Sequence, residues 1–291
     1  MGCDVVYQGY KVRKVGAQYE ITHFLYDVER RSGELSGASP AVCCGVGERD
    51  ISNLIRAKRR VYELCACNSW DYFCTFTLRP SYDRFDLAQW RKDFSQWLRN
   101  VRRLTGCDVK YVLVPEQHKN GCWHMHGMFF GLPSDEISTF VSSDIGDLDT
   151  SDIVKRMKAD FLNQRGYLCW RRYNKKWGFC SLAPVRNAQA CARYVSKYIS
   201  KDMLGGALDS GAHMYYASQG LKVGETVDFG ALVGDWDSSG LYHFCNDYIE
   251  RWTTDDIQRL PILCRIALER DTLVNNLGND NGGNFVSPLE W

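Results

Sequence analysis

Two histidines separated by one residue are the first candidates for chemistry in this chain. His124 and His126 are two of only six histidines, and the apolar stretches Tyr111–Val114 and Met128–Phe130 favour strands. Because side chains alternate across a strand, both imidazoles face the same way and Met125 faces the other. Two neutral imidazoles side by side form a pair of metal ligands. The alternative is a pair of hydrogen-bonded histidines on a half-buried face.

A second group of reactive side chains recurs at helical spacing. Tyr194, Lys197, Tyr198 and Lys201 lie within Asn187–Met203, whose pattern predicts a helix. On a helix they share one face, with the two tyrosines one turn and about 6 Å apart. Nearby ammonium groups are expected to favour a phenolate and to attract a phosphodiester. An ordinary amphipathic helix with aromatic packing is the alternative.

The two groups can act together on a phosphodiester. A phenol is a poor nucleophile at neutral pH. A divalent cation held by two histidine nitrogens and one carboxylate would neutralise the phosphate oxygens and keep positions open for substrate. Attack by a tyrosine would form a phosphotyrosine link and free a 3′ hydroxyl. The link preserves the energy of the phosphodiester, so the strand can later be rejoined.

The predicted elements around these groups form an α+β arrangement. Strands are expected at Asp4–Tyr10, Tyr19–Val28, Tyr72–Leu78, Val109–Val114, the histidine segment, Trp177–Leu182 and Met214–Ala217, and helices at Ile51–Leu64, Asp86–Leu104, Ile153–Leu162 and Arg251–Arg270. The polar segment Glu116–Gly121 has the composition of a hairpin connection, which brings Glu116 alongside His124. The order of elements predicts an antiparallel sheet with helices on one or both faces.

Charge is unevenly distributed along a chain whose net charge is only +1. The segment Lys155–Lys201 carries 12 lysines and arginines against one acid, interleaved with tyrosine and tryptophan. Cations contact phosphates and rings stack on bases, so this segment predicts a nucleic-acid surface. The candidate DNA-binding residues are Arg171, Arg172, Lys175, Lys176 and Arg193. Residues 225–291, with 12 acids and 4 arginines, are expected to dock a partner or to shield the basic groove.

Three blocks in this order resemble the HUH endonucleases, in particular the two-tyrosine rolling-circle replication initiators of small single-stranded DNA phages and bacterial plasmids. The blocks are a Phe-x-Thr-x-Thr strand (Phe73–Thr77), the His124–His126 strand and a Tyr-x-x-Lys-Tyr-x-x-Lys helix (Tyr194–Lys201). The resemblance implies a sheet of about five antiparallel strands and dependence on Mg²⁺ or Mn²⁺. It also implies a nickase that cuts single-stranded origin DNA, forms a 5′-phosphotyrosine and later rejoins the strand.

The resemblance assigns roles at the tyrosine helix. Tyr194 and Tyr198 would be the pair of nucleophiles, which can alternate so that one enzyme starts and ends a round. Lys197 and Lys201 would position the phosphate or a tyrosine.

The resemblance also assigns the metal ligands. His124 and His126 would be two of them. Glu116 is the preferred third ligand, because an acidic residue on the strand preceding the histidines serves in related initiators. Gln117 and His118 are adjacent alternatives.

The segments and their context follow from composition and motifs. We expect an N-terminal extension with a basic helix (1–67), an HUH endonuclease domain (68–220) and an acidic C-terminal extension (221–291). No Walker-type Gly-Lys-Ser/Thr sequence is present, so a host helicase and polymerase are the expected partners. No apolar run is long enough for a membrane span, and the N-terminus lacks a signal pattern. With thirteen cysteines, a reducing bacterial cytoplasm is expected.

Three other functions are alternatives. A transposase or mobilisation relaxase would use the same chemistry on different DNA. A nucleic-acid-binding regulator without catalysis would not need the tyrosine hydroxyls. A metallohydrolase would use water as nucleophile and leave no covalent adduct. The compact length without a helicase motif favours an initiator.

Overall fold

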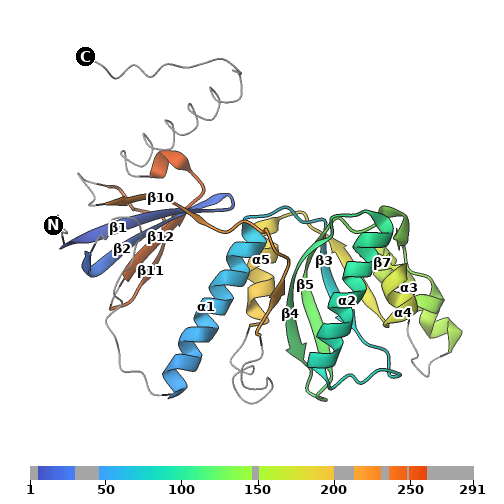
Figure 1. Cartoon of the computed structure of the whole chain (residues 1–291). Coiled ribbons are helices and arrows are strands. Elements are labelled where there is room, and N and C mark those ends of the chain that lie inside the picture. Colours follow the sequence, from blue (N-terminus) through green and yellow to red (C-terminus); the bar gives the residue numbers. More distant parts are fainter. Residues whose placement is uncertain are drawn as a thin grey trace, which may run out of the picture. The chain divides into compact units, whose positions relative to one another are not determined.

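The chain forms two compact units. The computed structural model describes residues 6–29, 46–145, 151–199, 213–230, 236–247 and 249–260. Contacts group residues 43–223 into one unit, and residues 1–42 with 224–291 into the other. Each unit contains its own five-stranded sheet (Figure 1). This grouping differs from the three segments expected from the sequence, because strands of the two terminal segments pair with each other.

The larger unit is an α+β fold around an antiparallel sheet, as predicted. Its strands, in spatial order, are β8 (Cys180–Pro184), β3 (Tyr72–Thr77), β5 (Trp123–Phe130), β4 (Lys110–Gln117) and β9 (Tyr216–Ala217). Every neighbouring pair is antiparallel. A separate short pair joins β6 (Ile137–Ser138) to β7 (Cys169–Trp170). The histidine strand therefore lies at the centre of the sheet.

Helix α2 covers one face of this sheet. It spans Leu87–Thr105, starts after Asp86, whose side chain accepts a hydrogen bond from the Gln89 amide, and ends at Gly106. Its buried stripe consists of Leu87, Trp90, Phe94, Trp97, Leu98 and Val101. The stripe shares a core with buried residues of β3, β4, β5 and β8 and with the short helix α4 (Arg171–Lys176). This apolar face leaves alternate strand residues, including both histidines, on the other face.

Two helices lie side by side against the other face. α1 (Val46–Ala66) contacts both α5 (Ala188–Lys197) and β4, and α5 contacts β5 (Figure 1). The Asn187 side chain caps α5 by accepting a hydrogen bond from the Ala190 amide. A further helix, α3 (Asp152–Gln164), and the short 3₁₀ turns η1 (Ser134–Glu136) and η2 (Ser142–Asp144) lie between β5 and β7 in sequence.

The smaller unit combines strands from the N-terminal and the C-terminal parts of the chain. Its sheet has the order β10 (Glu225–Gly230), β1 (Val6–Val15), β2 (Gln18–Glu29), β12 (Ile249–Thr254) and β11 (Tyr242–Cys245), followed by the 3₁₀ turn η4 (Ile257–Arg259). All its neighbouring strands are antiparallel. Its small buried core includes Val12, Ile21 and Trp252.

One prediction for this unit was wrong. A helix was expected from Arg251, but residues 251–254 belong to β12, where Trp252 and Thr254 are buried at alternate positions. Pairing with β2 and β11 therefore decides the conformation. The rest of the expected helix after Leu260 lies outside the described residues. Among the helices that the structure describes, none is both long and apolar enough to cross a membrane.

Candidate functional site

The sheet fixes the orientation of both histidines. His124 on β5 lies opposite Thr77 on β3 and Glu116 on β4, and His126 lies opposite Thr75. Thr77 Oγ1 is 3.0 Å from His124 Nδ1, and Thr75 Oγ1 is 3.1 Å from His126 Nδ1. When each Nδ1–H donates to its threonine hydroxyl, each Nε2 keeps a lone pair for a metal. The Phe-x-Thr-x-Thr motif thus orients the His-x-His motif.

Burial keeps both histidines neutral. It lowers the pKa of His126 to about 4, with a smaller contribution from the neighbouring His118. Burial also lowers the pKa of His124, with smaller contributions from the neighbouring His118 and His126 rings and from the Arg84 guanidinium, while the Glu116 carboxylate opposes this shift. At neutral pH both imidazoles are therefore in the form that binds metals.

Glu116 and His118 lie closest to the histidine pair among the candidates for a third ligand. Glu116 Oε2 is 2.7 Å from His126 Nε2, yet this buried nitrogen has no hydrogen-bond partner among the described residues. A buried nitrogen without a hydrogen bond, next to a carboxylate oxygen, fits a shared cation. The His118 ring lies 4.9 Å from the His124 ring. Gln117 instead donates a hydrogen bond to Gly121 O within the hairpin.

The donor atoms of His124, His126 and Glu116 do not form one compact group. The rings of His124 and His126 are 6.4 Å apart. Within the described ranges, the group with three donor atoms within 4.8 Å of one another is His243, Cys245 and Glu250, on β11 and β12 of the smaller unit. Sequence reasoning missed that group. The His-x-Cys spacing on a strand was the available signal, and the pairing of Cys245 with Glu250 required the structure.

Helix α5 brings both tyrosines to the histidine strand. The Tyr198 ring stacks on the His126 imidazole, with centroids 4.0 Å apart and an interplanar angle of 3°. The Tyr198 hydroxyl donates a hydrogen bond of 2.9 Å to the Tyr194 hydroxyl. The Tyr194 ring in turn contacts Phe73 of β3 edge-on, at 5.4 Å between centroids. The one-turn spacing predicted from the sequence therefore places two linked phenols beside the candidate metal ligands.

The phenol of Tyr198 keeps its proton in this arrangement. Burial raises the pKa of Tyr198 well above its usual value, and the hydrogen bond with Tyr194 and the charge of Glu116 raise it further. This differs from the expectation that ammonium groups would favour a phenolate. Lys197 is exposed at the end of α5, and Lys201 lies outside the described residues.

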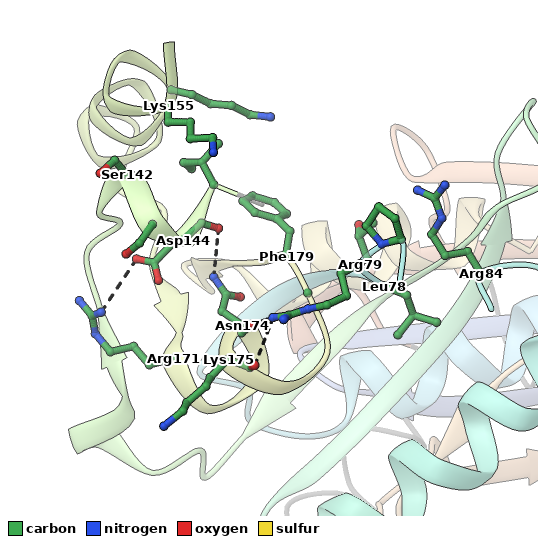
Figure 2. A pocket seen from close by; sticks show the side chains of 16 residues that line it. Leu78, Arg79, Arg84, Ser142, Asp144, Lys155, Arg171, Asn174, Lys175 and Phe179 are labelled. Carbon is green, nitrogen blue, oxygen red and sulfur yellow. Dashed lines mark hydrogen bonds and ion pairs between the residues drawn. The ribbon is translucent and has the colours of Figure 1, made fainter. Parts of the chain in front are cut away.

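The predicted DNA-binding residues divide into different environments. Arg171 and Lys175 are exposed on α4 and line a pocket of about 720 Å³ (Figure 2). Arg84, another lining residue, accepts a hydrogen bond through its carbonyl from the Trp123 amide at the start of the histidine strand. Lys176 lies 5.1 Å above the Trp177 ring. Arg172 is bound by the Glu136 carboxylate. Arg193 is exposed on α5. Arg171 and Lys175 are thus the two that share a concave, positively charged surface.

Comparison with known families bears on this same region. Residues 71–203 match the family model described as Replication-associated protein ORF2/G2P. The match covers just under half of the chain and includes β3, Glu116, both histidines and both tyrosines. It supports a relation to rolling-circle replication initiators. Searches of curated proteins and of solved structures found no match.

Several residues at this site were not predicted from the sequence. Arg79, Arg84, Asn174 and Phe179 come from segments distant in sequence and line the pocket together. The polar residues that follow the predicted strand Tyr72–Leu78 and the basic segment Lys155–Lys201 were visible in the sequence. Only the tertiary structure brings these two segments together.

Proposed function

We propose that this protein is a replication initiator that nicks single-stranded origin DNA with a tyrosine and later rejoins the strand. The observation that carries the proposal is the stacking of Tyr198 on His126, with Tyr194 hydrogen bonded to Tyr198. Two candidate nucleophiles thereby lie against the candidate metal ligands. The family match over the same residues supports a role in replication.

The tyrosines exchange one ester bond for another. The attacking phenol oxygen bonds to phosphorus, the bond from phosphorus to the 3′ oxygen breaks, and the phenolic proton is lost while the 3′ oxygen gains one. The products are a 5′-phosphotyrosine and a 3′ hydroxyl that can prime synthesis. Rejoining is the reverse, with a 3′ hydroxyl attacking the phosphotyrosine. The phosphotyrosine bond keeps the strand attached to the protein between these two steps, so rejoining needs no further energy source.

The hydrogen bond between the phenols gives them complementary roles. In the observed geometry Tyr198 donates to Tyr194, so negative charge developing on the Tyr194 oxygen would be stabilised during attack. Rotation of the two hydroxyls reverses donor and acceptor. Tyr194 is about half exposed, at 48%, whereas Tyr198 is half-buried, with one ring face against His126. Tyr194 is thus the more accessible to an incoming strand.

His124, His126 and Glu116 would hold Mg²⁺ or Mn²⁺. The buried His126 nitrogen without a hydrogen bond and the carboxylate oxygen 2.7 Å away support this assignment. When bound, such a cation neutralises phosphate oxygens and aligns the phosphorus for in-line attack. Thr75 and Thr77 hold the two imidazoles in one orientation for this role.

The biological setting is part of the proposal. Single-stranded origin DNA is the substrate, the cytoplasm of a bacterial host is the location, and a host helicase and polymerase are the partners.

A covalent-adduct assay tests the proposal. The protein is incubated with Mn²⁺ and single-stranded fragments that tile candidate origins, then denatured, and the DNA–peptide link is located by mass spectrometry. We expect an adduct on Tyr194 or Tyr198 that disappears in the Tyr194→Phe/Tyr198→Phe double variant. Tyr242→Phe, at an exposed tyrosine of the smaller unit, is the matched control.

The other outcomes identify the alternatives. Cleavage without an adduct would indicate a metallohydrolase, and DNA binding without cleavage would indicate a regulator. An adduct formed only on transposon ends or transfer origins would indicate a transposase or relaxase. No adduct with any tested metal or origin would overturn the nickase proposal.

A further inference from the structure

The pocket beside the histidine strand adjoins the candidate active site. It is lined by residues that follow β3, by η2, α3 and α4, and by Gly178 and Phe179 (Figure 2). Thr77 belongs to its wall and also contacts His124 through its hydroxyl. Arg84 lines the pocket, and its carbonyl accepts a hydrogen bond of 2.9 Å from the amide of Trp123, the residue before His124. A strand bound at the histidines can therefore continue into this pocket.

The pocket wall is strongly positive. Its basic residues are Arg79, Arg84, Lys155, Lys158, Arg171 and Lys175. Asp144 is the single acidic residue in the lining, and its carboxylate accepts a hydrogen bond from the Val141 amide and lies 4.0 Å from Arg171. This excess of cations favours a phosphate-bearing ligand.

An aromatic ring forms another part of the wall. Phe179 is half-buried and stacks on Phe140, with centroids 5.6 Å apart. The ammonium of Lys158, an exposed residue, lies 5.8 Å from the Phe179 centroid. A base that stacks on this ring would displace the ammonium toward the adjoining phosphate. A ring surrounded by cations suits a nucleotide, which carries a flat base and a charged phosphate.

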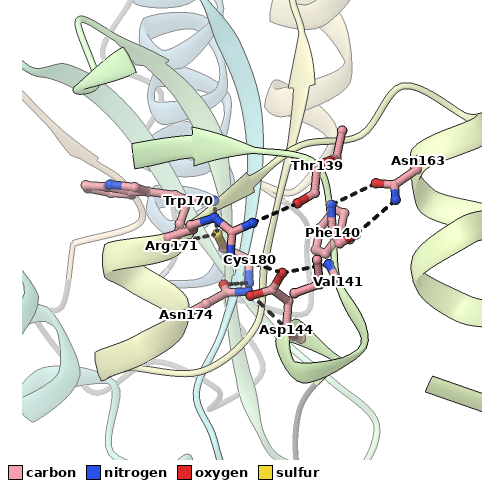
Figure 3. A network of polar contacts seen from close by, with 9 residues as sticks. All are labelled: Thr139, Phe140, Val141, Asp144, Asn163, Trp170, Arg171, Asn174 and Cys180. Atoms are coloured by element: carbon pink, nitrogen blue, oxygen red, sulfur yellow. Dashed lines mark hydrogen bonds and ion pairs between the residues drawn. The ribbon is translucent and has the colours of Figure 1, made fainter. Parts of the chain in front are cut away.

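A hydrogen-bond network holds this wall in place (Figure 3). The Asn163 side chain on α3 accepts a hydrogen bond from the Phe140 amide and donates one to the Phe140 carbonyl, at 2.8 and 3.0 Å. The Asn174 side chain on α4 accepts from the Cys180 amide at 2.9 Å and donates to the Asp144 carbonyl at 3.5 Å. The ring and the cations are thus presented by a fixed framework, which reduces the entropy lost on binding.

We propose that this pocket is a subsite for an unpaired nucleotide of the DNA strand next to the scissile phosphodiester. The inference rests on the proposed function, because it assigns the strand at the pocket to the substrate of that reaction. A volume of about 720 Å³ is in the range of small-ligand pockets and admits one or two nucleotides rather than a duplex. The site therefore selects single-stranded DNA near the point of cleavage.

Binding measurements test the subsite without requiring cleavage. Fluorescence anisotropy follows a labelled oligothymidylate of about 12 nucleotides, a length within the range that one single-strand-binding domain covers. Lys155→Gln and Phe179→Leu change the pocket, while Lys92→Gln and Phe130→Leu are matched controls at exposed residues outside it. We expect each pocket variant to weaken binding about fivefold or more, because Phe179→Leu removes a stacking surface and Lys155→Gln removes a positive charge that would contact phosphate. Controls should stay near wild type.

A free nucleotide shares the same chemistry and is separated by competition. The probe is dTMP, added to the complex of protein and oligothymidylate. If dTMP binds the pocket while the pocket variants bind the oligonucleotide like wild type, the ligand is a free nucleotide and the DNA assignment is wrong. Equal binding of the oligonucleotide and of a blunt duplex by the wild-type protein would also overturn it.

Photocrosslinking locates the nucleotide. An oligonucleotide carrying one 5-iododeoxyuridine, moved along the strand, is irradiated with the Tyr194→Phe/Tyr198→Phe variant and the crosslinked peptide is sequenced. We expect crosslinks to Phe179 from a restricted set of positions, and crosslinks that never reach the pocket wall would contradict the subsite. Using this variant separates the two proposals, since the subsite can be confirmed even if neither tyrosine is a nucleophile. Conversely, an adduct formed normally by Phe179→Leu would support the nickase and count against the subsite.

Discussion

The Tyr198 ring lies flat against the His126 imidazole, with centroids 4.0 Å apart and planes 3° apart. The contact joins the tyrosine helix to the central strand of the sheet. Tyr198 contacts His126 through its ring and Tyr194 through its hydroxyl. Substitutions can therefore remove the hydroxyl and the ring contact separately.

Substitution of Tyr198 tests that separation. Tyr198→Phe keeps the stacked ring and removes one part-exposed hydrogen bond, so its free energy of unfolding should fall by about 1 kcal/mol or less. Tyr198→Leu also removes the aromatic contact and should lose about a further 1 kcal/mol. Urea unfolding measures both. The adduct assay should show Tyr198→Phe impaired, with any remaining link on Tyr194. Equal destabilisation by Phe and Leu would show that the stack does not contribute.

The two threonine hydroxyls should control metal affinity. Thr75→Val and Thr77→Val keep the side-chain shape but remove the groups next to the histidine Nδ1 atoms. We expect each to weaken Mn²⁺ binding by about 10- to 100-fold, as is typical when an outer-shell partner is lost. Calorimetric titration measures the affinity. It is done in a Cys245→Ser background, which removes one donor of the separate His243–Cys245–Glu250 group. Wild-type Mn²⁺ affinity in both valine variants would contradict the orienting role of the hydroxyls. Thr75→Ser keeps a hydroxyl and should therefore bind Mn²⁺ like the wild type.

Gly127, directly after the histidine motif, should tolerate no side chain. A Cβ at this position would lie 1.9 Å from the Val112 carbonyl oxygen on β4. Gly127→Ala must therefore push the two central strands apart, and we expect a loss of about 3 kcal/mol or more, or failure to fold. Gly106→Ala is the comparison, because nothing lies within 4 Å of its Cβ and only its φ of 71° opposes alanine. That variant should lose about 1 kcal/mol. Similar unfolding curves for the two would refute the close strand approach.

The Glu136–Arg172 pair should make stability depend on pH. Burial raises the pKa of the Glu136 carboxyl, but hydrogen bonds from Arg172 and Trp170 outweigh it, so the net pKa lies below the usual value. The charged form therefore stabilises the fold above the unfolded-state pKa of about 4.3, and this contribution is lost as the pH falls through the lower folded-state pKa.

The difference between wild type and Glu136→Gln measures this contribution. We expect wild type to be more stable by about 1 kcal/mol at pH 7 and the difference to shrink below about pH 4. Urea denaturation at several pH values gives both free energies. A difference that stays constant down to pH 3 would contradict the assignment to Glu136.

Much of the larger unit could be predicted from local patterns. Alternation at Tyr72–Leu78 and the helical period of Asp86–Leu104 correspond to β3 and α2 within one or two residues. The fold class was predicted correctly for the same reason. The segment from Arg251 was not, since Trp252 and Thr254 are buried by strands from elsewhere in the chain. The local hydrophobic pattern predicts the wrong element where the strands that bury one face are distant in sequence.

The sequence by itself determined which groups can do chemistry here. His124 and His126 share a strand face, and Tyr194 and Tyr198 share a helix face, because each pair follows the period of a single element. Only the tertiary structure decided that Tyr198 stacks on His126, that Glu116 lies next to His126, and that Phe179 joins a cationic pocket. It also decided that β1 and β2 form one sheet with β10 and β12. These contacts join residues distant in sequence, and packing of the whole unit, not local conformational preference, selects them.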